Sequence, residues 1–199
     1  MKNHVVFGLS ILVILLALFS AGCDNGTKDS PEIAEPAEFE EYTGCTIKSF
    51  PNEKLVVFRC FDTMANLSSN FGELFQWFVI TQTEIYGPNT AIFFSTPTRF
   101  ERTDDSSKLM YYVGIPVAPD TIGSGKGKTL ELDATRAACT LHRGSFTKIN
   151  DSYARLLKWM GKQGLESKGL YREVYIRGPG PNDPGLPSKW ITELRIPVK

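Results

Sequence analysis

The sequence repeats itself at a spacing of about 80 residues. Leu74-Phe75-Gln76-Trp77-Phe78 corresponds to Leu156-Leu157-Lys158-Trp159-Met160, 82 positions later. Ile115-Pro116-Val117 returns as Ile196-Pro197-Val198, 81 positions later. Two independent matches at nearly one offset indicate two copies of a single structural unit. The fold must therefore be assembled from two similar halves.

Each copy has the same order of elements: a strand, a helix and two further strands. Residue type and alternation predict strands over 54–61, 90–95 and 109–117 in the first copy, and over 135–142, 171–177 and 190–198 in the second. Asp62 or Thr63 caps the first helix, and Gly144-Ser145 opens the second. The expected apolar faces at helical spacing are Leu67, Phe71, Leu74, Phe75 and Phe78 in one helix, and Phe146, Ile149, Tyr153, Leu156, Leu157 and Met160 in the other.

Two strand–helix–strand–strand units can join edges into one antiparallel sheet, giving an α+β fold. Both helices then cover one face, and the opposite face forms a ligand cleft along the axis that relates the copies. We expect one domain over 42–199, with repeat one at 42–118, a linker at 119–129 and repeat two at 130–199. The glycine-rich linker is not a phosphate-binding loop, because Ile122 stands where that motif requires its first glycine.

The first 22 residues are typical of a targeting segment. An apolar run over 5–19 is shorter than the ~20 residues that a spanning helix needs. It ends in Ser20-Ala21-Gly22-Cys23, which resembles the bacterial lipoprotein signal, in which the cysteine is lipidated. A plain secretory peptide is the alternative. Residues 23–41 are acidic and predict a disordered tether. The expected location is the cell envelope, anchored through Cys23 and facing the periplasm or the cell exterior.

The charge balance argues against a nucleic-acid partner. The first 41 residues hold two of the 22 bases and seven of the 22 acids, which leaves the domain with 20 Lys and Arg against 15 Asp and Glu. A net charge of +5 is too small for a nucleic-acid-binding surface, and no helix-turn-helix or zinc-finger spacing is present.

Three cysteines follow Cys23. Cys45 and Cys60 are equidistant from a turn-like segment over 51–54, so a hairpin there would place them opposite each other for a disulfide. The alternative is that all three, including Cys139, are small apolar residues in strands. A single histidine in this part of the chain, His142, gives no predicted metal site, and no cofactor is predicted.

Alternation along the last two strands of the second copy suggests which side chains line the cleft. In 171–177, Val174 and Ile176 suit the helix-covered core; in the last strand, Leu194 and Ile196 do so. By the repeat offsets, Phe93 is the first-copy counterpart of Tyr175, and Tyr112 is the counterpart of Glu193. The predicted ligand-binding residues are Glu193, Tyr175, Glu173, Tyr171, Tyr112 and Phe93.

Aromatic rings and carboxylates together suit a flat, apolar cation. The alternative is an ordinary half-exposed sheet face whose glutamates are neutralised by Arg172, Arg177 or Arg195.

Several segments resemble a known family. They are His142-Arg143-Gly144-Ser145-Phe146, Glu173-Val174-Tyr175-Ile176 and Trp190-Ile191-Thr192-Glu193 followed by Ile196-Pro197-Val198. Together they resemble the GyrI-like small-molecule-binding domain, which is also the effector-binding domain of AraC-type and MerR-type regulators. The resemblance implies tandem units, a central cleft and a ligand-facing glutamate at Glu193, with Tyr175 and Glu173 nearby. It is weaker over 42–117.

Three functions are compatible with these features. The first is a membrane-tethered binding protein for a small aromatic or cationic molecule, which sequesters it or presents it to a protein partner at the membrane. The second is a hydrolase of strained electrophiles, in which Glu193 activates water. The third follows from the similarity of this fold to SOUL-type haem-binding proteins, with His142 as axial ligand; the alternative for His142 is a hydrogen bond to the turn that follows it.

Overall fold

The computed structural model describes residues 42–94, 108–179 and 185–199. These residues belong to one unit, Pro36–Lys199. The predicted signal segment, the tether and Cys23 lie outside the described residues.

Eight strands and two helices build this unit. The strands are β1 (Cys45–Phe50), β2 (Glu53–Asp62), β3 (Thr90–Phe93), β4 (Leu109–Pro116), β5 (Lys128–Leu132), β6 (Thr135–Arg143), β7 (Tyr171–Arg177) and β8 (Ile191–Pro197). The helices are α1 (Leu67–Thr81) and α2 (Ile149–Lys162), preceded by the short 3-10 helices η1 (Met64–Asn66) and η3 (Phe146–Lys148). A third short helix, η4 (Pro187–Lys189), leads into β8. All six predicted strands and both helices are confirmed; β1 and β5 are additional.

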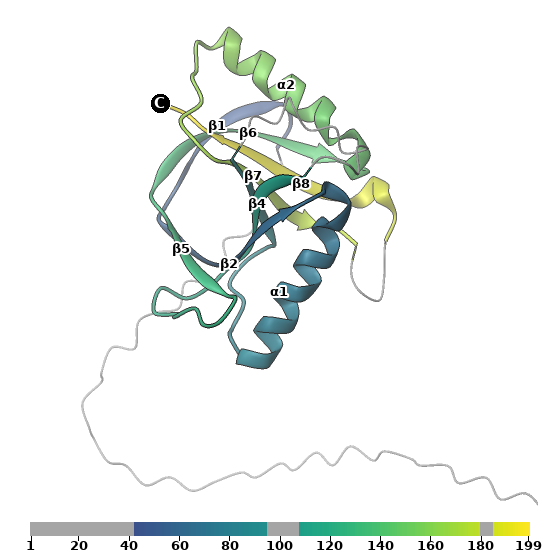
Figure 1. The fold of residues 1–199 in the computed structure, drawn as a ribbon. Helices are drawn as coiled ribbons and strands as arrows, with labels where there is room; N and C mark the ends of the chain where they lie inside the picture. Colours follow the sequence, from purple (N-terminus) through teal and green to yellow (C-terminus); the bar gives the residue numbers. More distant parts are fainter. Residues whose placement is uncertain (1–41, 95–107, 180–184) are drawn as a thin grey trace, which may run out of the picture. The chain divides into compact units, whose positions relative to one another are not determined.

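The strands form one antiparallel sheet in the order β1-β6-β8-β7-β3-β4-β2-β5. The two copies exchange their first strands, because β1 pairs with β6 and β5 pairs with β2. Only two residues join β1 to β2, and two join β5 to β6. Strands that are far apart in the sheet must therefore meet at these corners, and the sheet curls (Figure 1). The backbone N–H of Ala134 in one corner donates to Asn52 Oδ1 in the other at 2.6 Å.

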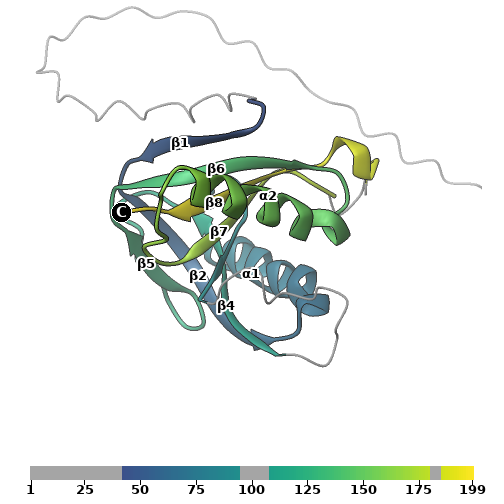
Figure 2. The same cartoon turned by 90° about the horizontal axis from the view of Figure 1, so that it is seen from above.

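Both helices lie on the outer face of the curled sheet, as Figures 1 and 2 show. α2 packs over β6, whereas α1 packs over β2 and β4. The predicted α+β architecture with two helices on one face is confirmed. In α1, Phe71, Leu74 and Phe78 are buried, but Phe75 remains 37% exposed. In α2, the buried apolar residues are Ile149, Tyr153, Leu156 and Met160.

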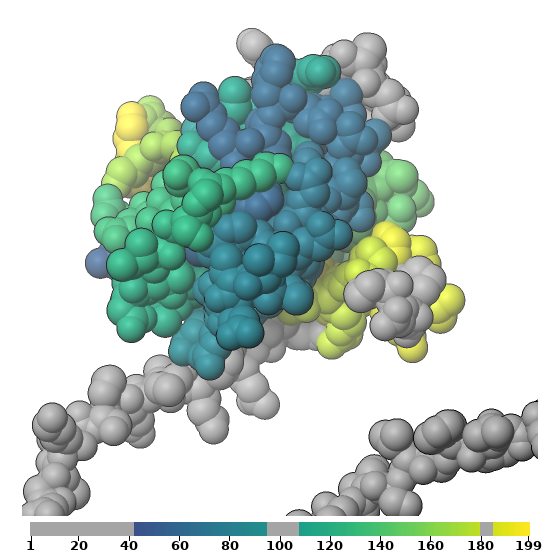
Figure 3. All heavy atoms as spheres, turned by 60° about the horizontal axis from the view of Figure 1, so that its bottom comes forward, coloured from purple at the N-terminus to yellow at the C-terminus, as the bar shows by residue number. Residues whose placement is uncertain are grey.

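The segment that precedes β5 packs against α1. The indole N–H of Trp77 donates to the Ser124 carbonyl at 3.0 Å, and Lys126 forms an ion pair with Glu73. Figure 3 shows this segment lying across the surface of α1. The predicted linker is therefore held on the first helix, and its last two residues, 128–129, already belong to β5.

Of the two alternatives left open for the cysteines, the disulfide between Cys45 and Cys60 is wrong. The segment 51–54 does not form a hairpin between β1 and β2, because β1 pairs with β6 at the other side of the sheet. Cys45 lies opposite Thr140, whereas Cys60 lies opposite Tyr111. Cys45, Cys60 and Cys139 are all free thiols.

The curl gives the sheet two apolar clusters instead of one. The larger cluster lies between the sheet and the helices, and we call it the helix-side core. The smaller one lies on the inner face and consists of Leu55, Val57, Ile92 and Leu132, with Tyr112, Leu130 and Leu170 packed against them. Both faces of the central strands are therefore covered.

This second cluster explains an error in the predicted faces. Tyr171 and Phe93 belong to the helix-side core, and Tyr175 packs against it. Glu173 lies on the same side, since it is directly opposite Leu194, another helix-side residue. The prediction that these four face away from the helices is wrong. That prediction assumed that only the helix-covered face of each strand is buried, and it therefore placed the apolar Val174 on the helix side. Val174 is instead buried on the inner face, opposite Glu193.

Candidate functional site

A buried carboxylate lies on the helix side of the sheet, where the two copies meet. Glu173 is on β7, which pairs with β8 of its own copy and with β3 of the first. The residue is 1% exposed. Tyr153 Oη donates to Glu173 Oε1 at 3.2 Å, and Tyr175 Oη donates to Glu173 Oε2 at 2.7 Å. Burial of an ionised carboxylate is costly without such donors, and these hydroxyls offset part of that cost.

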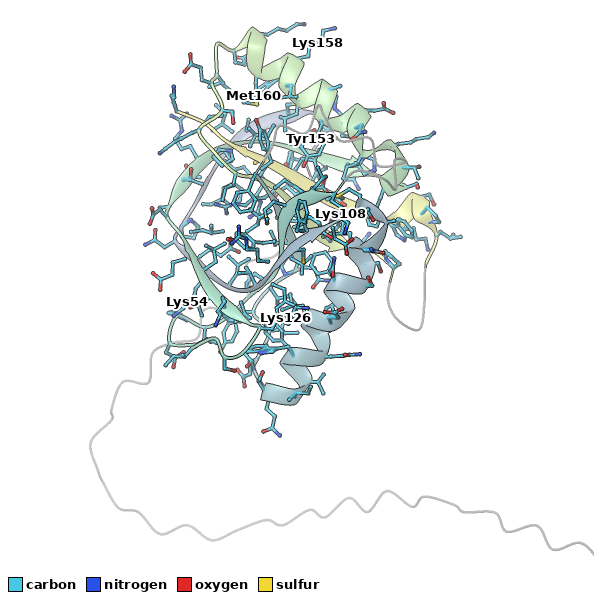
Figure 4. All side chains as sticks on the ribbon, in the orientation of Figure 1. Lys54, Lys108, Lys126, Tyr153, Lys158 and Met160 are labelled. Atoms are coloured by element: carbon cyan, nitrogen blue, oxygen red, sulfur yellow. The ribbon has the colours of Figure 1, made fainter. Side chains whose placement is uncertain are left out.

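Figure 4 shows Tyr153 pointing from α2 toward the sheet, whereas Lys158 on the same helix points away from it. Tyr153 is the one aromatic residue among the fully buried residues of α2. Its ring fills the space over β7 and its hydroxyl reaches the carboxylate. The second copy thus supplies both hydroxyl donors, one from its helix and one from its strand.

Further aromatic rings adjoin Tyr175, one of the two donors to this carboxylate. The ring of Tyr175 meets Phe71 of α1 edge-on at 5.6 Å and Phe146 of η3 at 5.4 Å between centroids. Phe146 stacks on Trp190 at 4.9 Å. Tyr175, Phe146 and Trp190 are half-buried, so this group of rings reaches from the carboxylate partner Tyr175 to the surface. We call Glu173, Tyr153, Tyr175, Phe71, Phe146 and Trp190 the Glu173 cluster.

An unsatisfied hydroxyl lies beside this cluster. Thr192 is fully buried on β8, directly opposite Tyr175 on one side and His142 on the other. Its Oγ1 has no hydrogen-bond partner among the described residues. Such groups are rare in folded proteins and need an explanation, for example a ligand or water that the hydroxyl can reach.

His142 is buried and holds the turn that opens the second helix. Its Nδ1 hydrogen-bonds Ser152 Oγ at 3.0 Å, and its Nε2 hydrogen-bonds the Ser145 carbonyl at 2.9 Å. Both ring nitrogens are engaged, which fits the turn-forming alternative better than an axial haem ligand. Among the described residues, no group of three or more His, Cys, Asp and Glu side chains is placed to hold a metal.

Glu193 lies on the inner face of the sheet and is held by cations. Arg195 Nε donates to Glu193 Oε2 at 2.6 Å, and Lys48 Nζ donates to Oε1 at 3.2 Å. Tyr42 Oη also donates to Oε1, at 3.0 Å. The Glu193 side chain is only 2% exposed.

These partners set the ionisation of the group. Burial raises the pKa of Glu193, but Arg195 and Lys48 outweigh burial and hold this pKa below its ordinary value. Burial and Glu193 raise the pKa of Tyr42, which therefore remains a neutral donor. A carboxylate with a lowered pKa and three donors is a weak general base. The geometry matches the alternative in which arginine neutralises this glutamate.

The structure divides the predicted ligand-binding residues into two groups. Glu173 and Tyr175 are in contact, and Tyr171 pairs with Phe93 on the same face. Tyr112 and Glu193 are on the inner face, but β7 and β3 lie between their strands. Tyr153, Phe71, Phe146, Trp190 and Thr192 were not predicted as neighbours of a candidate site. The first three lie on predicted helix faces and the last two in a predicted strand, and these positions gave no signal of a site, except for the tyrosine on the apolar face of α2.

The chain belongs to the family described as the GyrI-like small molecule binding domain, whose model matches residues 44–199. The fold is shared with solved structures of low sequence identity. The EcmrR C-terminal domain is 17% identical, with a TM-score of 0.58 over 78% of this chain and 96% of that one. A hydrolase encoded by lin2189 from Listeria innocua is 13% identical, with a TM-score of 0.55 over 78% and 92%. SAV2435 bound to tetraphenylphosphonium is 15% identical, with a TM-score of 0.52 over 79% and 94%. A search of curated proteins found no match.

Within the described ranges, no helix is both long enough and apolar enough to cross a membrane.

Proposed function

We propose that this protein is a membrane-tethered, extracytoplasmic binding protein for a small aromatic cation, and that the Glu173 cluster holds the ligand. One observation carries the proposal: at the junction of the two copies, a buried carboxylate accepts hydrogen bonds from two tyrosines, and one of these tyrosines adjoins a group of half-buried aromatic rings. Family membership supports small-molecule binding in general.

The chemistry of the cluster favours a cation with flat apolar groups. The faces of aromatic rings attract cations, and a desolvated contact of this kind is worth about 2 kcal/mol. The Glu173 carboxylate would neutralise the charge of the ligand after both are removed from water. Tyr175 contacts both the carboxylate and the rings of Phe71 and Phe146, so movement of its side chain would open a path to Glu173.

Tetraphenylphosphonium is a suitable probe, since it is the ligand named for a protein of similar fold. Titration calorimetry of the wild-type chain with this cation is expected to show saturable binding. Glu173→Gln is expected to weaken binding by about tenfold or more, because the amide keeps the shape and removes the charge. Triphenylphosphine oxide, a neutral analogue, is expected to distinguish the two proteins far less.

Glu193→Gln is the matched control, because it changes a second buried glutamate on the neighbouring strand. Binding of the cation to this variant is expected to be unchanged at a temperature where circular dichroism shows it folded. Equal loss of affinity in both variants, or none in either, would remove Glu173 from the ligand-binding role.

The location in the cell envelope is proposed from the sequence features of 1–22 and Cys23. Expression of the full chain in bacteria with labelled palmitate is expected to label the protein and place it in the membrane fraction. Cys23→Ala is expected to abolish the label. Equal labelling of both proteins would contradict an anchor at this cysteine.

A further inference from the structure

A second group of charged residues lies on the inner face of the sheet, away from the Glu173 cluster. Arg172 on β7 and Arg195 on β8 are directly opposite each other. Arg195 and Lys48 contact Glu193 at 2.6 and 3.2 Å, and Arg172 contacts Glu53 at 3.4 Å. We call these five residues the inner ionic cluster. Three of these five residues are cations and two are carboxylates.

The two carboxylates contact different numbers of cations. Glu193 forms ion pairs with both Arg195, at 2.6 Å, and Lys48, at 3.2 Å. Arg195 also stacks on the ring of Phe50 at 4.1 Å. Arg172 meets only a half-exposed carboxylate in this cluster: its Nη1 is 3.4 Å from Glu53 Oε2, which is long for a charge-assisted hydrogen bond.

Arg172 is also incompletely hydrogen-bonded. The residue is 6% exposed, and its Nε is buried without a hydrogen-bond partner among the described residues. Burial lowers the pKa of Arg172, and neighbouring Arg195 lowers it further, against the opposing effect of Glu53. A buried guanidinium with a free N–H and a like charge beside it is costly, and an anion would relieve both conditions.

We propose that Arg172 anchors a binding site for a small oxyanion, a carboxylate or phosphate group, on the inner face of the sheet. The Nε–H and a neighbouring Nη–H present the planar fork that binds two oxygens of such a group. Glu53, at the start of β2 and partly exposed, competes with the anion for Arg172. The site is independent of the Glu173 cluster, because the two lie on opposite faces of β7.

Thermal unfolding of the full chain at constant ionic strength tests this site. Inorganic phosphate, acetate and glycerol phosphate are compared with chloride, so that a free ion, a carboxylate and a headgroup-like phosphate are distinguished. At least one oxyanion is expected to raise the unfolding midpoint in a saturable manner. Arg172→Met is expected to weaken its apparent affinity about tenfold or more. Arg172→Lys, which keeps the charge but not the fork, is expected to lose most of it.

Two further variants separate ligand binding from a structural role. Glu53→Gln is expected to strengthen oxyanion binding, because it removes the competing carboxylate. Arg59→Met removes an exposed arginine whose Nε contacts Met110 Sδ, and it is expected to leave binding unchanged. Equal midpoints in all anions, or weaker oxyanion binding in Glu53→Gln, would overturn the proposal. If Arg172→Met does not fold, Glu53→Gln and Arg172→Lys still decide between the outcomes.

Discussion

Two glutamates of this protein are equally buried, yet their surroundings have opposite characters. Glu173 and Glu193 are each 1% exposed and lie on neighbouring strands. Glu193 faces the inside of the curled sheet, where Arg195 and Lys48 neutralise it. Glu173 faces the helices, where tyrosine hydroxyls donate to it among aromatic rings. The degree of burial alone therefore does not identify a binding carboxylate; the chemistry of the partners does.

The two glutamates face opposite sides of the sheet because they are one residue out of step across the paired strands. Val174, the residue after Glu173, is the direct partner of Glu193 across β7 and β8. Successive side chains of a strand point to opposite faces, so the two carboxylates are separated by the sheet itself. A mutation at one of them should affect the other little, and each can be tested as the control of the other.

The largest effect on stability is expected from Glu193→Gln. It leaves Arg195 and Lys48 without their carboxylate in a buried site, and loss of one partner of a buried ion pair costs about 3 kcal/mol or more. Urea unfolding measures this loss. Glu166→Gln is the control, because the exposed pair of Glu166 with Lys199 contributes less than about 0.5 kcal/mol. A loss at Glu193 no larger than that at Glu166 would show that the inner cations are solvated.

Acid should reveal the same ion pairs in the wild-type protein. The pKa of Glu193 is lowered in the folded state, so its contribution to stability is fully present above the unfolded value of 4.5. It is lost as the pH falls through the lower folded value. The free energy of unfolding, measured from pH 6 downward, is expected to fall more steeply below about pH 4.5 in wild type than in Glu193→Gln. Parallel curves would contradict a lowered pKa.

The repeat predicted the fold because a duplicated pattern determines the order of elements without knowledge of tertiary contacts. The repeat did not predict that the two copies exchange their first strands. β1 and β5 are short and partly polar, with Lys48 and Ser49 in one and Glu131 in the other, and each is stabilised by the opposite copy. Pairing between distant segments leaves no local signal, so the segment 51–54 resembled a hairpin although it forms a corner.

The site was harder to predict, because both faces of the central strands are covered. The alternation of apolar and polar residues then does not determine which set of side chains faces the helices. In β8 the apolar Leu194 and Ile196 point to the helices, as predicted, and Glu193 does not. In β7 the helix-facing residues are Tyr171, Glu173 and Tyr175, which have the pattern of an exposed face. Their hydroxyls and rings are accommodated beneath α1, η3 and α2, a tertiary environment that the strand sequence does not specify.

A smaller loss of stability is expected from Glu173→Gln. The amide oxygen still accepts a hydrogen bond from a tyrosine, and the charge assistance of the bonds from Tyr153 and Tyr175 disappears, at about 1 kcal/mol. Urea unfolding should place this variant between wild type and Glu193→Gln. A loss as large as that of Glu193→Gln would mean that Glu173 is also a structural charge, and the contrast between the two faces would fail.

The smallest effect is expected from Lys48→Met, which divides the inner contribution between its two cations. Lys48 is 28% exposed and lies 3.2 Å from Glu193, whereas Arg195 is 15% exposed and lies 2.6 Å away. The more solvated and more distant cation contributes less to holding Glu193, about 0.5 kcal/mol. Urea unfolding of Lys48→Met beside Arg195→Met should show the larger loss for the arginine variant. The reverse order would mean that Glu193 is held chiefly by β1, so that detachment of this edge strand, rather than the pairing of β8 with its neighbours, would determine whether the carboxylate becomes exposed.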